Sequence, residues 1–266
     1  MCYRFSNIQE EKEFREHMRQ LGKIFKHTTE EAQGRFSFFH TNGFAHEKLP
    51  VISEEKPDVI SYMNWGLIPS KTKTRADKDK IWKMGYTLNA RSEEIFTTWS
   101  FKDNIRSHRC LVPATGFFEW RDYNKVKYPY LIQVHKAEEF QSFFFQGIYD
   151  YWTDKETGEH FESFSILTCA ANPMLKKVHV NLSRPDLGGR MPVIIADNDF
   201  DKWLNPDATE KDIKELMKPY PEEQMYAYTI SKDITSRKVN PDRAETLSHV
   251  HYDELKEESS FNAPCC

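Results

Sequence analysis

The chain has 266 residues, which is long enough for one large domain with its own hydrophobic core. Hydrophobic residues make up only 39% of it, but aromatic residues reach 14%, so we expect a core built largely from rings. No stretch approaches the ~18 apolar residues of a membrane span, and the first ten residues lack the apolar segment of a secretory signal. The net charge of -4 excludes a wholly basic coat for nucleic acid but permits a local basic patch.

Five cysteines are scattered along the chain without a Cys-x-x-Cys pair or a histidine pair at zinc-finger spacing. We therefore expect no metal site and no cofactor. An odd set of cysteines without a signal peptide is typical of reduced thiols in a cytoplasmic protein. The five are Cys2, Cys110, Cys169, Cys265 and Cys266.

The predicted elements begin with a helix over Ile8 to Leu21, whose apolar residues fall on one stripe. Short aromatic and β-branched runs then predict strands at Val59–Trp65, Cys110–Pro113, Tyr128–Val134, Phe143–Tyr149, Phe161–Cys169, Met191–Ile195 and Tyr226–Ile230. The turn pair Thr157-Gly158 indicates an antiparallel hairpin. Two late helices are expected at Asn198–Leu204 and Thr209–Met217, the latter with a capping box formed by Asp207 and Glu210.

Strands dominate this series and do not alternate regularly with helices, which excludes a doubly wound nucleotide-binding fold. The pattern predicts an α+β fold: a single β-rich domain with a curved, mostly antiparallel sheet or barrel and peripheral helices. We place this domain at residues 1–252. The polar, acidic residues 253–266 are expected to form a flexible tail.

Cys2 is the first candidate for chemistry, since an initiator methionine is commonly removed before a small second residue. The new terminus would carry an α-amine with a pKa of about 7.7–8.0 beside a thiol with a pKa of about 8.5. Such a 1,2-aminothiol condenses with an aldehyde, first to a Schiff base and then to a five-membered thiazolidine. The alternative at this point is an incidental buried cysteine.

A basic run over 70–84 has Trp82 and Tyr86 beside it and leads into Asn89-Ala90-Arg91-Ser92-Glu93. A basic loop with nearby rings suits phosphate contacts and base stacking. A solvated charge run would have the same composition.

Glu119 stands among aromatic residues in Gly116-Phe117-Phe118-Glu119-Trp120, where partial burial would favour a proton donor or acceptor near neutral pH. It can equally be a glutamate at a strand end that reaches water. His179 gains a catalytic interpretation only if it shares a site with Glu119 and Cys2. Ser165 and Thr168 with His179 give little support to a serine hydrolase, because no Gly-x-Ser-x-Gly motif is present.

Five motifs together make the sequence specific. Their order resembles that of the SRAP family (SOS-response-associated peptidase), whose members are understood as abasic-site processing proteins. The resemblance extends from Cys2 to at least Asn240, and the motifs are Met1-Cys2-Tyr3-Arg4-Phe5, Trp65-Gly66-Leu67-Ile68-Pro69, Asn89-Ala90-Arg91-Ser92-Glu93, Gly116-Phe117-Phe118-Glu119-Trp120 and Arg190-Met191-Pro192-Val193-Ile194.

The resemblance implies a β-rich protein that binds single-stranded DNA containing abasic sites and crosslinks to the lesion through its N-terminal cysteine. It assigns Cys2 as the nucleophile, Asn89 as the residue that orients the Cys2 end, and Glu119 as the acid or base. Arg4, Arg91 and Arg190 would hold phosphates, with Trp65 and Trp120 near the flanking bases. It also implies a thiol autopeptidase that removes Met1. We expect a monomer that is cytoplasmic, and nucleoid-associated when bound to DNA.

The sequence departs from the family pattern in three places. Tyr3 replaces the usual glycine, and Gly188 stands where the family histidine usually precedes Arg-Met-Pro. His179 therefore takes the histidine role, with 181–189 as an insertion before Arg190. The segment 42–46 replaces the family's Asn-x-Ala-Pro turn.

Three other interpretations share some of these residues. An N-terminal-nucleophile cysteine hydrolase would turn over amides without DNA. A non-covalent DNA-binding module would lose affinity steeply with salt and survive the loss of Cys2. A lyase would let the Schiff base break the strand instead of closing the ring.

Overall fold

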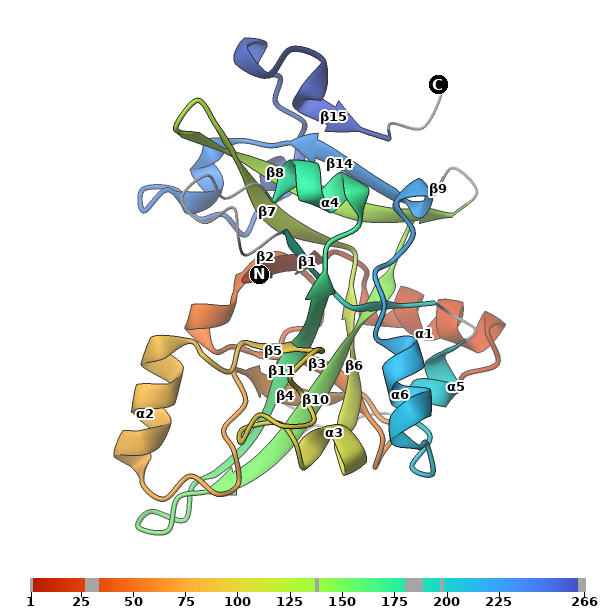
Figure 1. The fold of residues 1–266 in the computed structure, drawn as a ribbon, viewed down its shortest axis with the longest axis vertical. Helices are drawn as coiled ribbons and strands as arrows, with labels where there is room; N and C mark the ends of the chain where they lie inside the picture. Colours follow the sequence, from red (N-terminus) through yellow and green to blue (C-terminus); the bar gives the residue numbers. More distant parts are fainter. Residues whose placement is uncertain (1, 27–33, 137–138, 180–188, 197–198, 263–266) are drawn as a thin grey trace.

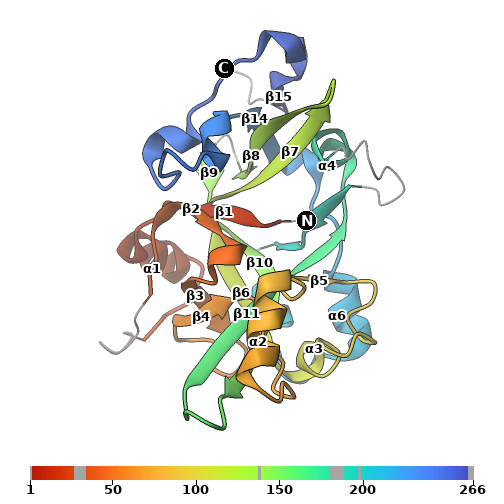
Figure 2. The same ribbon diagram turned by 90° about the vertical axis from the view of Figure 1, so that its left-hand side faces the viewer.

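The structure is a computed structural model, and it describes residues 2–26, 34–136, 139–179, 189–196 and 199–262. Two β-sheets are stacked along the long axis of the molecule (Figure 1), and the N-terminus lies where they meet in both ribbon views (Figure 2). The helices lie around the outside. This is the predicted α+β class with a single β-rich body and peripheral helices.

One sheet closes on itself as a five-stranded barrel, because β11 pairs with both β4 and β10 at the two ends of the order β11-β4-β3-β6-β10. Closure leaves these strands without a free edge. Their bounds are Lys48–Ser53 (β3), Ser61–Trp65 (β4), Arg109–Ala114 (β6), Phe143–Thr153 (β10) and His160–Ala170 (β11). The short strands β5 (Asn89–Arg91), β12 (Arg190–Pro192) and β13 (Ile194–Ile195) extend the sheet.

The second sheet has the order β15-β14-β8-β7-β1-β2, with β9 paired to β8. All its pairings are antiparallel, whereas the sheet that forms the barrel contains two parallel pairings, β11 with β4 and β11 with β5. Its strands are β1 (Arg4–Asn7), β2 (Phe38–Asn42), β7 (Gly116–Tyr123), β8 (Val126–Lys136), β9 (Glu139–Gln141), β14 (Met225–Thr229) and β15 (Ser260–Phe261).

Local turn chemistry explains the two longest hairpins. Between β7 and β8, Asn124 and Lys125 both have positive φ angles, 48° and 63°, as a tight two-residue turn requires. Between β10 and β11, Gly158 has a φ of 74°, and the Asp154 amide donates to the Glu159 carbonyl at 2.9 Å. The predicted Thr157-Gly158 turn is confirmed.

The predicted strand regions all contain strands, but Met191–Ile195 is divided between β12 and β13. The sequence pattern misses β1, β2, β3, β5, β7, β9 and β15. Strand β1 has only four residues, and β7 carries rings and charges without a clean alternation, so neither shows the period of two that marks a strand.

The helices are α1 (Glu11–Gln20), α2 (Arg75–Met84), α3 (Asn104–Ser107), α4 (Pro173–Val178), α5 (Phe200–Trp203) and α6 (Glu210–Leu216). The first helix begins later than predicted, because Glu10 and Glu13 form a capping box ahead of it. The basic run is not a loop, since most of it forms α2 behind a capping box of Thr74 and Asp77. The predicted cap of the last helix is also wrong.

The capping box of α6, the last helix, consists of Thr209 and Asp212 instead of the predicted Asp207 and Glu210. Thr209 has the extended backbone conformation of an N-cap, with a φ of -72° and a ψ of 162°, and its side chain accepts from the Asp212 amide. Of the predicted Asn198–Leu204 helix, residue 198 lies outside the described residues.

Residues 253–262, predicted as part of a flexible tail, instead pack on the second sheet. Strand β15 pairs with β14, and Leu255 in the 3-10 segment Asp253–Ser259 is buried. The Tyr130 hydroxyl donates to the Glu258 carbonyl at 2.5 Å, and Arg121 forms an ion pair with the Glu258 carboxylate. The polar, acidic composition of this segment predicts a flexible tail, because it gives no sign of the few contacts that hold it on the sheet.

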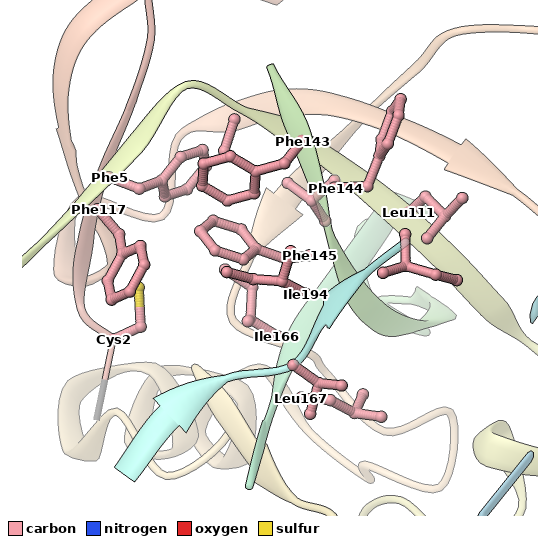
Figure 3. Packing of buried hydrophobic residues seen from close by; sticks show 14 of the residues in the cluster. Cys2, Phe5, Leu111, Phe117, Phe143, Phe144, Phe145, Ile166, Leu167 and Ile194 are labelled. Carbon is pink, nitrogen blue, oxygen red and sulfur yellow. The ribbon is translucent and has the colours of Figure 1, made fainter. Parts of the chain in front are cut away.

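The core is aromatic, as the composition predicts. Figure 3 shows Phe5 of β1 packed among side chains of the barrel, with Cys2 beside Phe117. The Phe5 ring makes edge contacts with Phe145 and with the fully buried Trp65. The two sheets therefore share one core at the point where the N-terminus lies.

Replacing Trp65 by alanine is expected to cost about 3–5 kcal/mol of unfolding free energy, because it empties a fully buried site. Trp99→Ala, at an exposed tryptophan, should change stability by no more than about 0.5 kcal/mol. Urea unfolding followed by circular dichroism measures both. Equal stabilities of the two variants would contradict the placement of Trp65 in the core.

Candidate functional site at the N-terminus

The N-terminal segment is held at the junction of the two sheets by backbone pairing. Strand β1 lies between β2 and β7, with Phe5 opposite both Thr41 and Phe117. Cys2, just ahead of β1, is fully buried, and its sulfur lies 3.7 Å from the Arg4 carbonyl oxygen. The position of the cysteine is therefore set by the sheet and not by a free terminus.

Asn89 fixes the other side of Cys2. Its side-chain amide donates to the Cys2 carbonyl oxygen at 2.9 Å. Strand β5 positions Asn89, because β5 runs parallel to β11 with Asn89 opposite Ile166. The Asn89 Oδ1 atom is buried and has no hydrogen-bond partner among the described residues, so it can accept from a donor near Cys2.

The Cys2 thiol is poorly suited to ionise in this setting. Burial raises the pKa of Cys2 well above its usual range, and the negative charge of Glu119 raises it further. The thiol of Cys2 is therefore neutral at rest, with Glu119 near enough to influence its pKa. Such a thiol reacts only if a base accepts its proton during the attack.

Glu119 and His179 form the second part of the site. The His179 Nδ1 atom lies 3.2 Å from a carboxylate oxygen of Glu119, which is 4% exposed. Glu119 comes from β7, while His179 is the residue that ends α4. The helix is started by Asn172, whose side chain accepts from the Leu175 amide, and by Pro173 in its first turn. The fold thus brings His179 to Glu119 across 60 residues of sequence.

A cavity of about 400 Å³ opens beside this pair. It is lined by Tyr3, Arg4, Asn42, Phe44, Glu119, Trp120, Asp122, Lys127, His179 and Thr235. Cys2 is not part of the lining, but Tyr3 next to it is. This space has the volume of a small-ligand site and holds acidic, basic and cationic side chains. We call it the lesion cavity, after the role that the family resemblance implies for the residues around it.

Arg4 and Trp120 lie together at the lesion cavity. The Arg4 guanidinium stands over the Trp120 ring, 5.7 Å from its centroid. It also bonds His40 Nε2 at 2.9 Å and donates to the Ile234 carbonyl at 3.4 Å. Arg4 forms no ion pair with any residue in the part of the chain that the structure describes, so its charge remains available to an anion.

Arg91 and Arg190 differ in their surroundings. Arg91 lies close enough to Tyr3 to oppose the rise in its pKa that burial and the charge of Glu119 produce. Arg190 instead forms a two-pronged ion pair with Glu93, at 2.8 and 3.1 Å, and donates to Thr168. Contact between Arg190 and a phosphate would compete with Glu93.

Trp65 does not line the lesion cavity. It is fully buried, and its indole nitrogen donates to the Leu88 carbonyl, so it supports the core and cannot stack on a base without unfolding. Trp82 is also engaged, stacked on His46 at 4.3 Å with Lys78 over its ring. Of the predicted stacking residues, Tyr86 remains 69% exposed.

Sequence reasoning missed several residues around the site. His40, Lys127 and Thr235 come from segments without a motif, and only the three-dimensional fold brings them to Arg4 or the lesion cavity. Asn42 lies in the altered turn, where its side chain accepts from the Phe44 amide and caps the short 3-10 turn Gly43–Ala45. Residues 181–188 of the predicted insertion 181–189 lie outside the described residues.

Within the described ranges, no three His, Cys, Asp or Glu side chains gather as a metal site would require. No helix there is long and apolar enough to cross a membrane. Cys2, Cys110 and Cys169 are free thiols.

The protein is therefore an α+β barrel protein. A cysteine is buried at the junction between its five-stranded barrel and its second, antiparallel sheet. A profile of the family "SOS response associated peptidase (SRAP)" matches residues 1–237, and the chain belongs to this family.

The relatives agree with this assignment. A protein named "Abasic site processing protein YoqW" from Bacillus subtilis is 32% identical over 195 residues, covering 72% of this chain and 78% of that protein. "Abasic site processing protein HMCES" from Gallus gallus is 30% identical and covers 75% of this chain, which spans 60% of that protein. A crystal structure of a Bacteroides thetaiotaomicron protein is 33% identical, with a TM-score of 0.80 over 94% of this chain and 100% of that one.

Stability is expected to depend on pH through His40. Burial, followed by the charge of Arg4, lowers the pKa of His40 to about 4, whereas the unfolded chain titrates near ~6.5. The unfolded chain thus binds more protons between these values, and stability falls as the pH drops through that window. His40→Gln should reduce this loss in urea titrations at several pH values.

His160→Gln is the matched control, because His160 is exposed on β11. It should keep the pH dependence of the unmodified protein. Identical slopes for His40→Gln and the unmodified protein would contradict the buried, neutral state of His40.

Proposed function

We propose that this protein acts on abasic sites in single-stranded DNA and forms a covalent thiazolidine crosslink through Cys2. The observation that carries the proposal is the placement of Cys2, next in sequence to Tyr3 of the lesion cavity, beside the Glu119–His179 pair. The names of the relatives, which refer to abasic-site processing, support it.

The first requirement is removal of Met1, which exposes the Cys2 amine. In the proposed autopeptidase step, water cleaves the Met1–Cys2 peptide bond and releases methionine. Asn89 holds the Cys2 carbonyl during this step, since its amide already donates to that oxygen. The buried Asn89 Oδ1 can then accept from the new amine.

The amine next attacks the aldehyde of the ring-opened deoxyribose. His179 or Glu119 protonates the carbonyl oxygen, and the resulting carbinolamine loses water to give an iminium. A carboxylate beside the site stabilises this positive charge. The lesion cavity also holds Lys127 and Arg4, whose charges favour the flanking phosphates.

Ring closure then uses the thiol. Because the pKa of the Cys2 thiol is raised, the S–H group adds to the iminium carbon while Glu119 accepts its proton. A C–S bond forms, and the electron pair of the C=N bond moves to nitrogen. The product is a neutral five-membered ring, in which the strand-breaking β-elimination of a lyase no longer has an iminium to drive it.

Single-stranded DNA suits this geometry, because a duplex would have to be opened to bring the sugar to a recessed cavity. Arg4 and Lys127 line the cavity and would contact phosphates, with Trp120 beside a base, and Arg91 would add a charge near Tyr3. Arg190 joins them only if it exchanges Glu93 for a phosphate.

Cys2→Ala is expected to abolish the heat-stable adduct with a single-stranded oligonucleotide carrying one abasic site, because its α-amine can form only a hydrolysable Schiff base and no thiol is left to close the ring. Intact mass spectrometry measures the adduct and the loss of Met1. Cys169→Ala, at another buried thiol, should form it normally. A stable adduct of Cys2→Ala would overturn the mechanism, and turnover of amides without DNA would favour the hydrolase interpretation.

Glu119→Gln should slow crosslinking by about 10²–10⁴-fold, as expected when a general acid or base is lost with little change in shape. The rate is measured by quenching at timed intervals and gel separation. Glu156→Gln, at the exposed tip of the β10–β11 hairpin, should stay within about threefold of the unmodified protein. Equal rates for the two variants would remove Glu119 from the mechanism.

A further inference from the structure

Two of the departures from the family pattern meet in space. Tyr3 stands where the family usually has glycine, and Phe44 belongs to the segment 42–46 that replaces the family's turn. Their rings lie 5.5 Å apart, tilted by 39°, and both line the lesion cavity. The backbones are joined as well, because the Gly43 amide donates to the Tyr3 carbonyl oxygen at 2.9 Å. The two changes therefore form one feature of the cavity wall.

Contacts on both sides hold the Tyr3 ring in place. The Asn42 side chain accepts from the Phe44 amide at 3.2 Å, which fixes the turn. The Phe44 ring packs against Gly85, where a methyl group would come within 2.6 Å of it. On the other side, Tyr3 follows Cys2, whose position in the core is set by strand pairing. The half-buried phenol is thus presented to the lesion cavity from a fixed backbone.

The charges around Tyr3 suit a proton donor. Burial raises the pKa of Tyr3, the negative charge of Glu119 raises it further, and the positive charge of Arg91 opposes the rise. The phenol therefore stays protonated at neutral pH. If it gave up its proton for a moment, Arg91 would stabilise the phenolate. Glu119 lies in the same cavity as a proton acceptor.

The crosslinking reaction has an earlier step that needs such a donor. The Cys2 amine attacks an open-chain aldehyde, whereas an abasic deoxyribose is mostly a closed hemiacetal. Opening the ring breaks the bond between C1′ and O4′, removes a proton from the O1′ hydroxyl and adds one to O4′. Fast opening thus requires a proton acceptor and a proton donor at two oxygens of one sugar.

We propose that Tyr3 is a further catalytic residue of this chain, which donates its phenolic proton to O4′ of the closed abasic sugar. Glu119 accepts the proton of the O1′ hydroxyl, the C1′ carbonyl forms, and the electron pair of the C1′–O4′ bond moves to O4′. The phenolate then regains a proton from Glu119, so both side chains return to their starting state. Because a phenol is a stronger acid than an alcohol, the transfer to O4′ is favourable.

This inference rests on the proposed function and is tested with two single-stranded probes. One carries a true abasic site. The other carries an open-chain aldehyde in which hydrogen replaces the 4′-hydroxyl, so that no ring can form. The variant is Tyr3→Phe, which keeps the ring that contacts Phe44 and removes only the hydroxyl. Rates of adduct formation are measured with the full chain by timed quenching and gel separation.

Tyr3→Phe should slow crosslinking to the true abasic site by about 10²-fold, as expected when a general acid is lost. Its rate with the open-chain probe should stay within about twofold of that of the unmodified protein, because no ring has to open. Its affinity for an oligonucleotide with tetrahydrofuran in place of the sugar, measured by fluorescence anisotropy, should also change less than about twofold. Tyr226→Phe, half-buried on β14 and not in the cavity lining, removes the same hydroxyl and should leave both rates unchanged.

Slowing of both probes by the same factor, or of neither, would overturn the assignment, because the hydroxyl would then not act in ring opening. A loss of affinity for the tetrahydrofuran probe as large as the loss of rate would overturn it too, since Tyr3 would then only bind. If the unmodified protein forms no Cys2 adduct with either probe, the proposed function fails and this inference fails with it. A failure confined to Tyr3 is thus distinguishable from a failure of the function.

Discussion

The pairing of β1 between β2 and β7 is the constraint on which the site depends. It places Phe5 opposite Phe117, two residues before Glu119, and so sets the spacing between the N-terminal cysteine and the carboxylate. The Phe5 side chain inserts among barrel residues, including Phe145 and Trp65 (Figure 3). One short strand thereby joins the two sheets and makes Cys2 a fixed part of the core.

Burial then determines the chemistry that each group can perform. Cys2 and Glu119 are both buried, and the charge of Glu119 adds to the burial that raises the pKa of Cys2, so the thiol stays protonated. His40 is likewise kept neutral, so that Arg4 retains a charge that no described carboxylate cancels. The same desolvation raises the pKa of Cys2 and lowers that of His40, because burial disfavours the charged form of each group.

Distant motifs meet because the strands carry them to the same edge. The Glu93 carboxylate and the Arg190 guanidinium, 97 residues apart, form an ion pair where β5 and β12 flank β11. Glu119 and His179 meet in the same way across β7 and α4. Each of these ion pairs joins two segments that are weak signals singly, which explains why the order of the motifs along the chain is more informative than any one of them.

The sequence by itself determined the aromatic core, most of the long strands, the turn at Gly158 and the identity of Cys2, Glu119 and His179 as candidates. These depend on local periodicity and residue chemistry, which are legible in a single chain. Only the tertiary structure decided that Trp65 is core, that α2 is a helix, that residues 253–262 pack on the sheet, and that His40 and Arg237 lie beside Arg4. Those outcomes depend on contacts between residues far apart in sequence, whose energies no local pattern records.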